Sequence, residues 1–277
     1  MKEVERVKTY GFCTGVARAL RILEKEAPIE TLHDAVHNPE VAKRLKGKGI
    51  VKQDNLSEVQ GKAVAIRAHG EPPEVYKQIE KRNLRIVDTT CPIVGRAQKL
   101  AHEFANQNFG VIIFGDKKHA EVQGILGNAG DHGIATSCAS EAKDFLSHTS
   151  HIACLSQTTQ RPNTFWSFVL SLPLAPSLKE LQAVNTICPE VIRRQEEVAH
   201  LILKVELMVI VGGRNSANTQ NLARICLDAG KAFQFIENAP GVSKLGPSSN
   251  FRVGVASGTS TPSEVVDEVV ERIRCLV

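Results

Sequence analysis

The sequence predicts an α/β protein of three related lobes, each with a mainly parallel sheet, arranged with pseudo-threefold symmetry as a trefoil. Three observations predict this fold. Short runs rich in Val and Ile alternate with helical patterns along the 277 residues, and 42% of the residues are apolar, enough for a full core. A pattern of strand, cysteine and helix occurs three times. After each cysteine, two further strands end in small or polar residues, which indicates three copies of one unit.

The alternation of strands and helices sets the expected order of the elements. Strands are predicted in six segments: Lys62–Arg67, Leu84–Val87, Gly110–Phe114, His151–Leu155, Leu207–Val211 and Phe251–Ala256. Helices are predicted in five: Val16–Lys25, Ile93–Asn106, Val191–Lys204, Thr219–Asp228 and Ser263–Ile273. Buried strands that alternate with helices form parallel sheets. We expect one lobe in each of residues 10–91, 92–188 and 189–277, acting as one unit, and we place the loop Leu172–Ser177 between two copies of the repeat.

The three cysteines of the repeat stand in matching positions. Cys13, Cys91 and Cys188 each lie between a strand and a helix, and Thr89–Pro92 is similar to Thr186–Pro189 residue by residue. The prolines stand where a helix begins, a position that tolerates a missing N–H. Since α/β proteins place ligands at the carboxyl ends of parallel strands, pseudo-threefold packing would bring the cysteines and the polar strand ends into one central cavity.

Composition and charge exclude several classes of protein. The net charge of +4 suits an anionic small substrate or an acidic partner, but no Lys/Arg stripe indicates nucleic acid. The first residues resemble no signal or transit peptide, and no run of eighteen apolar residues occurs, so we expect a cytoplasmic protein without a membrane span. Seven cysteines, an odd number without an export signal, argue against a disulfide framework.

Three cysteines at helix starts suit an iron–sulfur cluster. The positive end of a helix dipole favours the thiolate, and three cysteine ligands leave one iron of a cluster open to substrate. Zinc is a competing interpretation, but structural zinc usually has four ligands at short spacings that this sequence lacks. Inert buried thiols are a third. We expect no metal at the other four cysteines, which are Cys138, Cys154 and Cys226, inside apolar patterns, and Cys275, near the C-terminal end.

The polar strand ends offer groups that bind phosphate and move a proton. Three histidines can donate hydrogen bonds to diphosphate oxygens: His37, His69 and His119. Glu121 is a candidate proton donor because burial raises the pKa of a carboxyl group, and Thr158 or Thr159 can orient it. Small-residue loops before helices can cradle phosphate at Ser216, Asn218 and Ser260. Taken singly, the histidines could be ordinary surface or core residues, Glu121 could face solvent at a helix start, and the hydroxyl residues could be helix caps.

The sequence contains no motif for a nicotinamide or flavin cofactor. Residues Gly127–Gly133 read GNAGDHG, which lacks the spacing of a dinucleotide fingerprint. The electrons for a reduction at the cluster would therefore come from another protein.

An ordered set of motifs resembles one family closely. From Tyr10 to Pro262 the motifs are GFCTGVARA, VHNPEV, RAHGEPP, DTTCPIVGRAQ, HAEVQG, SQTT, NTICPEVIRRQ, GGRNSANT and GTSTP. In this order they resemble the 4-hydroxy-3-methylbut-2-enyl diphosphate reductases, the last enzymes of the non-mevalonate isoprenoid pathway. Several of the motifs are weak alone, but the ordered set is highly specific and spans most of the chain.

The resemblance implies a trefoil around one [4Fe–4S] cluster, held by Cys13, Cys91 and Cys188, with one iron open to the substrate hydroxyl. It implies reductive removal of an allylic hydroxyl group, in which two electrons and two protons enter, water leaves, and isopentenyl and dimethylallyl diphosphate form. A ferredoxin or flavodoxin would supply the electrons. The implied residue roles are Glu121 as proton donor, Thr158 as its helper, His37, His69 and His119 as substrate contacts, and Ser216, Asn218 and Ser260 as diphosphate contacts.

Three residues depart from the pattern of the family. Ala120 replaces a proline, Ala217 a serine and Val191 a threonine, and we expect these changes to affect substrate affinity rather than the cluster. Two other classes of function stay open. One is a lyase or transferase like quinolinate synthase, which also holds a three-cysteine cluster among three α/β lobes but needs no net electron input. The other is a redox sensor without turnover.

Overall fold

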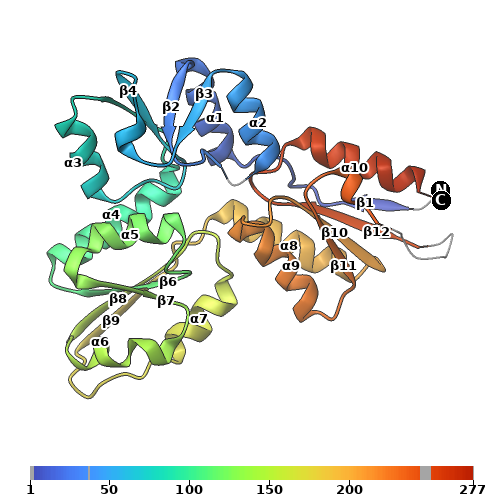
Figure 1. Cartoon of the computed structure of the whole chain (residues 1–277). Coiled ribbons are helices and arrows are strands. Elements are labelled where there is room, and N and C mark those ends of the chain that lie inside the picture. Colours follow the sequence, from blue (N-terminus) through green and yellow to red (C-terminus); the bar gives the residue numbers. More distant parts are fainter. Residues whose placement is uncertain (1–2, 37, 244–250, 277) are drawn as a thin grey trace. The chain divides into compact units, whose positions relative to one another are not determined.

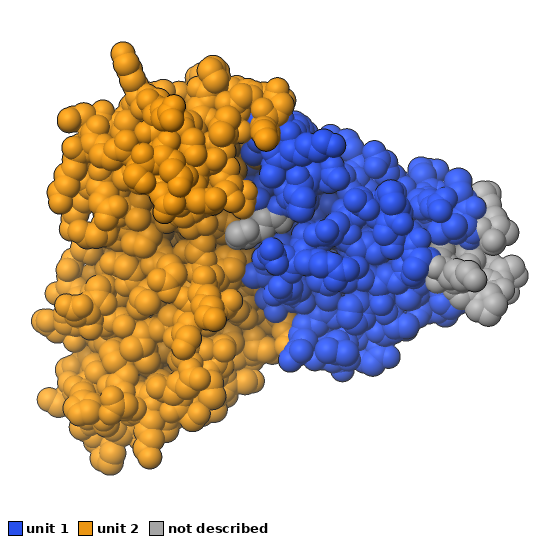
Figure 2. All heavy atoms as spheres, viewed as in Figure 1, with its two compact units in different colours: residues 1–17, 36–45, 189–277 blue, residues 18–35, 46–188 orange. Residues whose placement is uncertain are grey.

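The computed structural model describes residues 3–36, 38–243 and 251–276. Its strands form three separate four-stranded sheets, in which every pairing is parallel, and helices flank each sheet (Figure 1). The predicted fold of three parallel α/β lobes is therefore confirmed. By its contacts the chain divides into two compact units, residues 1–17, 36–45 and 189–277, and residues 18–35 and 46–188 (Figure 2).

Two sheets belong to the second of these units. The first has the order β3–β2–β4–β5 and the second the order β7–β6–β8–β9. The strands and helices of the first lobe are α1 (Thr14–Glu26), β2 (Ile29–Leu32), α2 (Pro39–Gly47), β3 (Ile50–Gln53), β4 (Ala63–Ile66), α3 (Pro73–Lys81) and β5 (Arg85–Asp88). Those of the second are α4 (Pro92–Asn106), β6 (Gly110–Phe114), α5 (Ala120–Ala129), β7 (Gly133–Thr136), α6 (Lys143–Ser147), β8 (His151–Ser156), α7 (Pro162–Leu170) and β9 (Glu180–Val184).

The third sheet belongs to the other unit and has the order β1–β12–β10–β11. Its elements are β1 (Val4–Arg6), α8 (Pro189–Ile202), β10 (Leu207–Val211), α9 (Ala217–Asp228), β11 (Phe233–Ile236), β12 (Val253–Ser257) and α10 (Ser263–Cys275). Short 3-10 turns lie at Leu56–Glu58, Gly130–His132, Ala139–Ala142 and Ala239–Gly241.

All three sheets share one strand order. In the first two sheets, the first strand in sequence lies between the second and the third, and the fourth pairs with the third at the edge. In the third sheet β10 lies likewise between β11 and β12, and a fourth strand pairs with β12 at the edge. In the last lobe this fourth strand is β1, which pairs with β12 and packs against α10, so the two ends of the chain build one sheet. An ion pair between Arg6 and Asp267 joins β1 to α10.

The shared order explains where the cysteines stand. Cys91 follows the edge strand β5 and precedes α4, which packs on α5 and β6 of the next lobe. Cys188 stands likewise between β9 and α8, and Cys13 between β1 and α1. Each strand–cysteine–helix pattern is therefore the crossing of the chain from one sheet to the next lobe, rather than a part of a single lobe.

The cores lie on both faces of the central strands. The strands β6, β10 and β12 are buried along their whole length, as expected for parallel strands covered by helices on both sides. The edge strand β9 alternates between exposed and half-buried residues. The loop Leu172–Ser177 joins α7 to β9, the strand before Cys188, and therefore lies between the second and the third copy of the strand–cysteine–helix pattern, as expected, although it lies inside one lobe.

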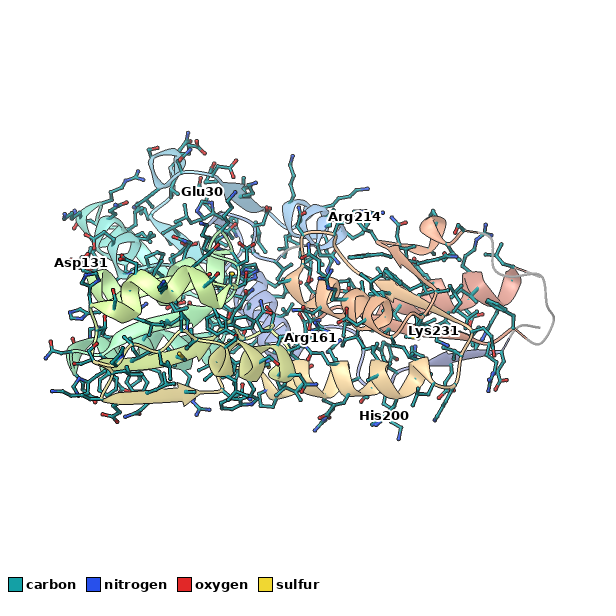
Figure 3. The ribbon with its side chains drawn as sticks, turned by 90° about the horizontal axis from the view of Figure 1, so that it is seen from below. Glu30, Asp131, Arg161, His200, Arg214 and Lys231 are labelled. Atoms are coloured by element: carbon teal, nitrogen blue, oxygen red, sulfur yellow. The ribbon has the colours of Figure 1, made fainter. Side chains whose placement is uncertain are left out.

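The exposed side chains of Asp131 and His200 point away from the sheets (Figure 3). None of the described helices has the length and hydropathy needed to cross a membrane.

Candidate functional site

The backbones of the three repeat cysteines are held in the same way. Each cysteine N–H donates a hydrogen bond to a carbonyl in one of the polar strand ends that the repeat predicted. The three bonds run from Cys13 to Thr259 (3.0 Å), from Cys91 to Ala68 (2.9 Å) and from Cys188 to Thr158 (2.9 Å). The equivalence drawn from the sequence is therefore present in the main chain, and each bond ties a cysteine to the end of the sheet that the chain has just left.

The thiols of these cysteines are half-buried and lie at helix starts. The N–H of Val16 donates to Cys13 Sγ at 3.3 Å, and the N–H groups of Ile93 and Val94 donate to the thiol of Cys91. These donors lower the pKa of Cys91, as the helix start predicted. Burial outweighs them, aided by the nearby Cys188 and Glu121, and raises the pKa of Cys91. The helix start thus favours the thiolate of Cys91, as expected, but burial outweighs this effect, and a bound metal would displace the proton of the thiol.

The other four cysteines lie elsewhere. Cys154 and Cys226 are core residues, and burial raises the pKa of each thiol to about 12. Cys275 is exposed, and so is Cys138, which precedes a 3-10 turn and contacts Ser140 at 3.1 Å. The expectation that Cys138 lies in a buried element was wrong, because the strand before it ends at Thr136.

The chemistry of the three repeat cysteines fits an iron–sulfur cluster. They are half-buried cysteines at helix starts that form no disulfide bond among the described residues, and N–H donors to sulfur stabilise thiolate ligands. Among residues 3–36, 38–243 and 251–276, no group of three His, Cys, Asp or Glu side chains is arranged to hold a single metal ion. Cys13 belongs to one compact unit, and Cys91 and Cys188 belong to the other.

Glu121 and Thr158 form a buried pair. Glu121, on the first turn of α5, is 1% exposed, and Thr158, after β8, is 5% exposed. The Thr158 N–H donates to Glu121 Oε1 at 2.5 Å and its hydroxyl donates to Oε2 at 2.9 Å. The carbonyl of Thr158 accepts the Cys188 N–H, so one residue contacts both the carboxyl group and the backbone of a candidate ligand.

The burial of Glu121 sets its protonation. Desolvation raises the pKa of this carboxyl group from 4.5 to about 7, although the two hydrogen bonds from Thr158 lower it. A carboxyl group with a pKa near neutrality holds a proton and can also release it. The predicted role of Glu121 as proton donor is consistent with this environment.

Two of the three predicted histidines lie beside this pair. His119 caps α5, and its Nδ1 accepts the Glu121 N–H at 3.2 Å, which assigns the proton of the neutral ring to Nε2. The ring of His69 meets that of His119 edge-on, with centroids 5.5 Å apart. His69 directly follows Ala68, which accepts the Cys91 N–H. His37 lies outside the described residues.

The predicted phosphate loops lie together in the other unit. Ser216 caps α9, where its hydroxyl accepts the Thr219 N–H at 3.4 Å, and Ser260 is 6% exposed in the loop after β12. A Cβ atom at Gly212 or at Gly258 would overlap Thr219, so the two loops pack closely around this threonine. Among the described residues, both amide atoms of Asn218, a side chain only 1% exposed, lack a hydrogen-bond partner.

Sequence reasoning missed two contributors to this site. Thr219 fills the space between the two glycine-bearing loops, and the nearby glycines were the signal that a side chain packs against them. Arg67 and Glu71 bracket His69 and form a buried ion pair of 2.7 Å, the carboxyl pKa being raised by burial. Their spacing within RAHGE was the signal, but it cannot reveal burial.

Comparisons with known proteins agree with one another. A family model described as LytB protein matches residues 4–274. A 4-hydroxy-3-methylbut-2-enyl diphosphate reductase of Dehalococcoides mccartyi (strain CBDB1) is 39% identical over 273 residues, which cover 96% of each chain. The enzyme of that name from Nautilia profundicola is 30% identical over 98% of each chain.

Two solved structures have the same fold. One, described as (E)-4-hydroxy-3-methyl-but-2-enyl diphosphate reductase, the terminal enzyme of the non-mevalonate pathway, is 32% identical, with a TM-score of 0.71 over 99% of each chain. The other, the E-1-hydroxy-2-methyl-but-2-enyl-4-diphosphate reductase from Plasmodium falciparum, has a TM-score of 0.89 at 23% identity. It covers 98% of this chain and 87% of its own, and at that identity it shows the fold alone. The resemblance drawn from the motifs is confirmed.

Proposed function

We propose, since the chain belongs to the LytB protein family, that it reduces 4-hydroxy-3-methylbut-2-enyl diphosphate to isopentenyl and dimethylallyl diphosphate. This is the terminal step of the non-mevalonate pathway. The observation that carries the proposal is the buried Glu121–Thr158 pair, joined through the Thr158 carbonyl to Cys188. The loss of a hydroxyl group as water needs a proton donor in a closed site, and Glu121 has the burial and pKa for that task.

The proposed cofactor is one [4Fe–4S] cluster with Cys13, Cys91 and Cys188 as ligands and one open iron. When bound, such a cluster supplies electrons and a Lewis-acidic iron. The matching backbone bonds and the half-buried thiols of the three cysteines support this assignment. The three lobes, residues 10–91, 92–188 and 189–277, would act as one catalytic unit around it.

The chain's own residues would hold the substrate and move the proton. Thr158 would orient the Glu121 carboxyl group with two hydrogen bonds. Asn218, with Ser216 and Ser260, would bind the diphosphate at the start of α9, where N–H groups and the helix dipole favour an anion. His119 would donate from Nε2, with His69 and His37 as further substrate contacts.

The electron donor and the cellular location complete the proposal. Ferredoxin or flavodoxin would supply the electrons, and the enzyme would act in the cytoplasm, as the sequence predicts. An anaerobic assay tests the reaction class. Reduced methyl viologen should be oxidised when the hydroxylated diphosphate is added to cluster-loaded protein. A lyase like quinolinate synthase, or a redox sensor, would consume no electrons, and that result would refute the reductase.

Replacing Asn218 with Leu is expected to weaken substrate binding without destabilising the protein. The buried amide has no protein partner, so its removal leaves no group newly unsatisfied and raises the free energy of unfolding by about 1 kcal/mol or leaves it unchanged. The KM for the diphosphate should rise about tenfold or more, as expected when charge-assisted hydrogen bonds are lost. Steady-state kinetics and urea unfolding measure the two effects.

The same substitution at Asn38 is the matched control. Asn38 is also buried, but its Oδ1 accepts the N–H groups of Glu40 and Val41 at the start of α2. Asn38→Leu should therefore lower the free energy of unfolding by about 1 kcal/mol. A comparable loss of stability in Asn218→Leu, with KM unchanged, would contradict the proposed role.

A further inference from the structure

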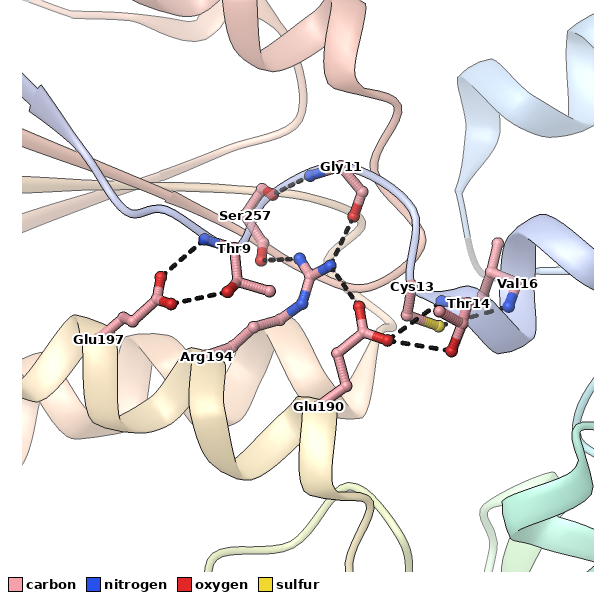
Figure 4. A network of polar contacts seen from close by, with 9 residues as sticks. All are labelled: Thr9, Gly11, Cys13, Thr14, Val16, Glu190, Arg194, Glu197 and Ser257. Carbon is pink, nitrogen blue, oxygen red and sulfur yellow. Dashed lines mark hydrogen bonds and ion pairs between the residues drawn. The ribbon is translucent and has the colours of Figure 1, made fainter.

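One buried charge in the last lobe has no part in the reaction described above. Arg194, on α8, is 1% exposed and is the largest fully buried side chain among the described residues. Its Nη1 donates to the Ser257 carbonyl at 3.2 Å, and its Nη2 donates to the Gly11 carbonyl at 2.9 Å (Figure 4). Nη2 also pairs with Glu190 Oε1 at 3.1 Å. Burial of a guanidinium group destabilises a protein unless the group is paired, so the contacts of Arg194 have a specific role.

The other two lobes show what this contact replaces. The residue two positions before Cys91 is Thr89, whose hydroxyl donates to the carbonyl of Ile66, the last residue of β4, at 2.5 Å. The residue two positions before Cys188 is Thr186. Its hydroxyl bonds in the same way to the carbonyl of Ser156, the last residue of β8. In both copies a threonine hydroxyl fixes the approach to the cysteine.

The copy before Cys13 has no such hydroxyl. The matching residue is Gly11, whose φ of +79° favours glycine over any threonine. The carbonyl that a threonine would reach belongs to Ser257, the last residue of β12, and it accepts Arg194 Nη1 instead. The other terminal nitrogen of the guanidinium group, Nη2, donates to the carbonyl of Gly11 itself.

Two carboxylates on α8 extend this anchoring along the same segment. Glu190 Oε2 accepts both the N–H and the hydroxyl of Thr14 at 3.1 Å, while its other oxygen pairs with Arg194. Glu197 accepts the N–H of Thr9 at 2.7 Å and its hydroxyl at 2.6 Å. Helix α8 therefore holds the segment Thr9–Thr14 at both of its ends and in its middle, with Cys13 inside it (Figure 4).

We propose that Arg194 is a positioning residue for Cys13, in which a guanidinium group performs the task that threonine hydroxyls perform for Cys91 and Cys188. Together with Glu190, it fixes the backbone of residues 11–14 and thereby the direction of the Cys13 thiol. A further consequence concerns the cluster: without Arg194, Cys13 is the first of the three ligands to leave it. This consequence alone rests on the proposed function.

The positioning itself is measured in cluster-free protein. Amide hydrogen exchange should become about tenfold to a hundredfold faster at residues 11–14 in Arg194→Met, because this variant loses the charge-assisted hydrogen bond to Gly11 and the ion pair with Glu190, the residue that holds Thr14. The amides of Cys91 and Cys188 should exchange as before, since Thr89 and Thr186 still hold them. Arg193→Met is the matched control, because this neighbouring arginine of α8 is exposed. Unchanged exchange at residues 11–14 would overturn the inference, whatever the cluster does.

The link to the cluster has its own readout. In anaerobically reconstituted protein, Arg194→Met should lose iron to a chelator about tenfold faster than wild type and Arg193→Met, in line with the loss of a partner behind a ligand. The rate of iron loss in Arg194→Lys should lie between those of Arg194→Met and wild type, because an ammonium group keeps the positive charge but lacks the planar, two-nitrogen geometry of a guanidinium group. Equal rates in Arg194→Met and Arg193→Met would refute the link.

Failure of the proposed function and failure of this inference give different results. A wild-type protein that takes up no cluster would refute the proposed function and leave the exchange result standing. If Arg194→Met does not fold, Glu190→Gln keeps the arginine but removes its carboxylate partner. This second variant should speed exchange in the same segment, and unchanged exchange there would also overturn the inference.

Discussion

Glu121→Gln is expected to lower turnover of the diphosphate substrate about 10²- to 10⁴-fold, the range that a positioned proton donor contributes. The amide keeps the size of the side chain and can still bond to Thr158, accepting from its N–H and donating to its hydroxyl oxygen. It has no acidic proton to release. Cluster content and the EPR spectrum should therefore match wild type while the chemical step slows. Single-turnover kinetics with pre-reduced enzyme measures that step.

Glu141→Gln is the matched control for this variant. Glu141 also accepts a threonine hydroxyl, that of Thr136, at 2.6 Å, but it is an exposed residue of a 3-10 turn. Its replacement should leave turnover unchanged. Retained turnover in Glu121→Gln would exclude Glu121 as the proton donor.

The same variant should change how stability depends on pH. Burial raises the pKa of Glu121 from 4.5 to about 7, so the folded protein binds this proton more tightly than the unfolded chain. Its contribution to stability is complete below pH 4.5, is lost as the pH rises to about 7, and is then constant, a change of about 3 kcal/mol. Glutamine carries no charge and suffers no such loss.

Urea unfolding of cluster-free protein at pH 4.5 and pH 8 tests this dependence. The difference in unfolding free energy between Glu121→Gln and wild type should shift in favour of the variant by about 3 kcal/mol between the two pH values. An equal difference at both would show that Glu121 titrates normally. Turnover of wild type should fall above about pH 7, as the carboxyl group loses its proton.

Replacing any one of Cys13, Cys91 and Cys188 with Ser is expected to abolish the cluster and the activity together. Serine is a poor ligand for iron in such clusters, and two thiolates cannot hold one alone. Iron should fall well below about four atoms per chain. Turnover should fall at least about a hundredfold, since loss of a partner behind a metal ligand already costs about 10- to 100-fold. Iron analysis after anaerobic reconstitution measures the first effect.

The exposed cysteines provide the control for this series. Cys138→Ser and Cys275→Ser should bind iron and turn over like wild type, because both thiols lie at the surface. A normal cluster in any one of the three repeat variants would show that another residue supplies the ligand. Iron loss in a control variant would place the cluster elsewhere.

The sequence predicted five of the six central strands, β4, β6, β8, β10 and β12, because each is a mainly apolar run. It missed β2, in which Glu30 and Thr31 interrupt the run. It placed the edge strand β9 only as the strand before Cys188, without bounds, because the exposed and half-buried residues of β9 lack the apolar run of the central strands. The strand that the repeat places before Cys13 was given no bounds for a different reason, since β1 is only Val4–Arg6. Its three residues form a strand only because β12, about 250 positions away in the chain, offers a free edge. Such pairing over a long separation is set by the completed sheet rather than by local pattern.

The candidate site was predicted where a repeat or a motif marked it. The three cysteines, Glu121 and Thr158 were found in this way, whereas the buried guanidinium of Arg194 was missed. The signal was present, since Val191, Arg194, Gln195 and Val198 follow the helical spacing of a buried stripe and are all buried. Arg193 falls outside that stripe. An arginine in an apolar stripe indicates a partner, but only the fold shows that the partner is the loop before Cys13.

The claim that three cysteines hold one [4Fe–4S] cluster with an open iron is tested most directly by Mössbauer spectroscopy. The protein is reconstituted anaerobically with ⁵⁷Fe and measured with and without the diphosphate substrate. We expect one iron site in four to differ from the other three and to change its isomer shift when substrate is added. Four equivalent irons whose isomer shifts do not change when substrate is added, or a protein that binds zinc and no cluster, would contradict the claim.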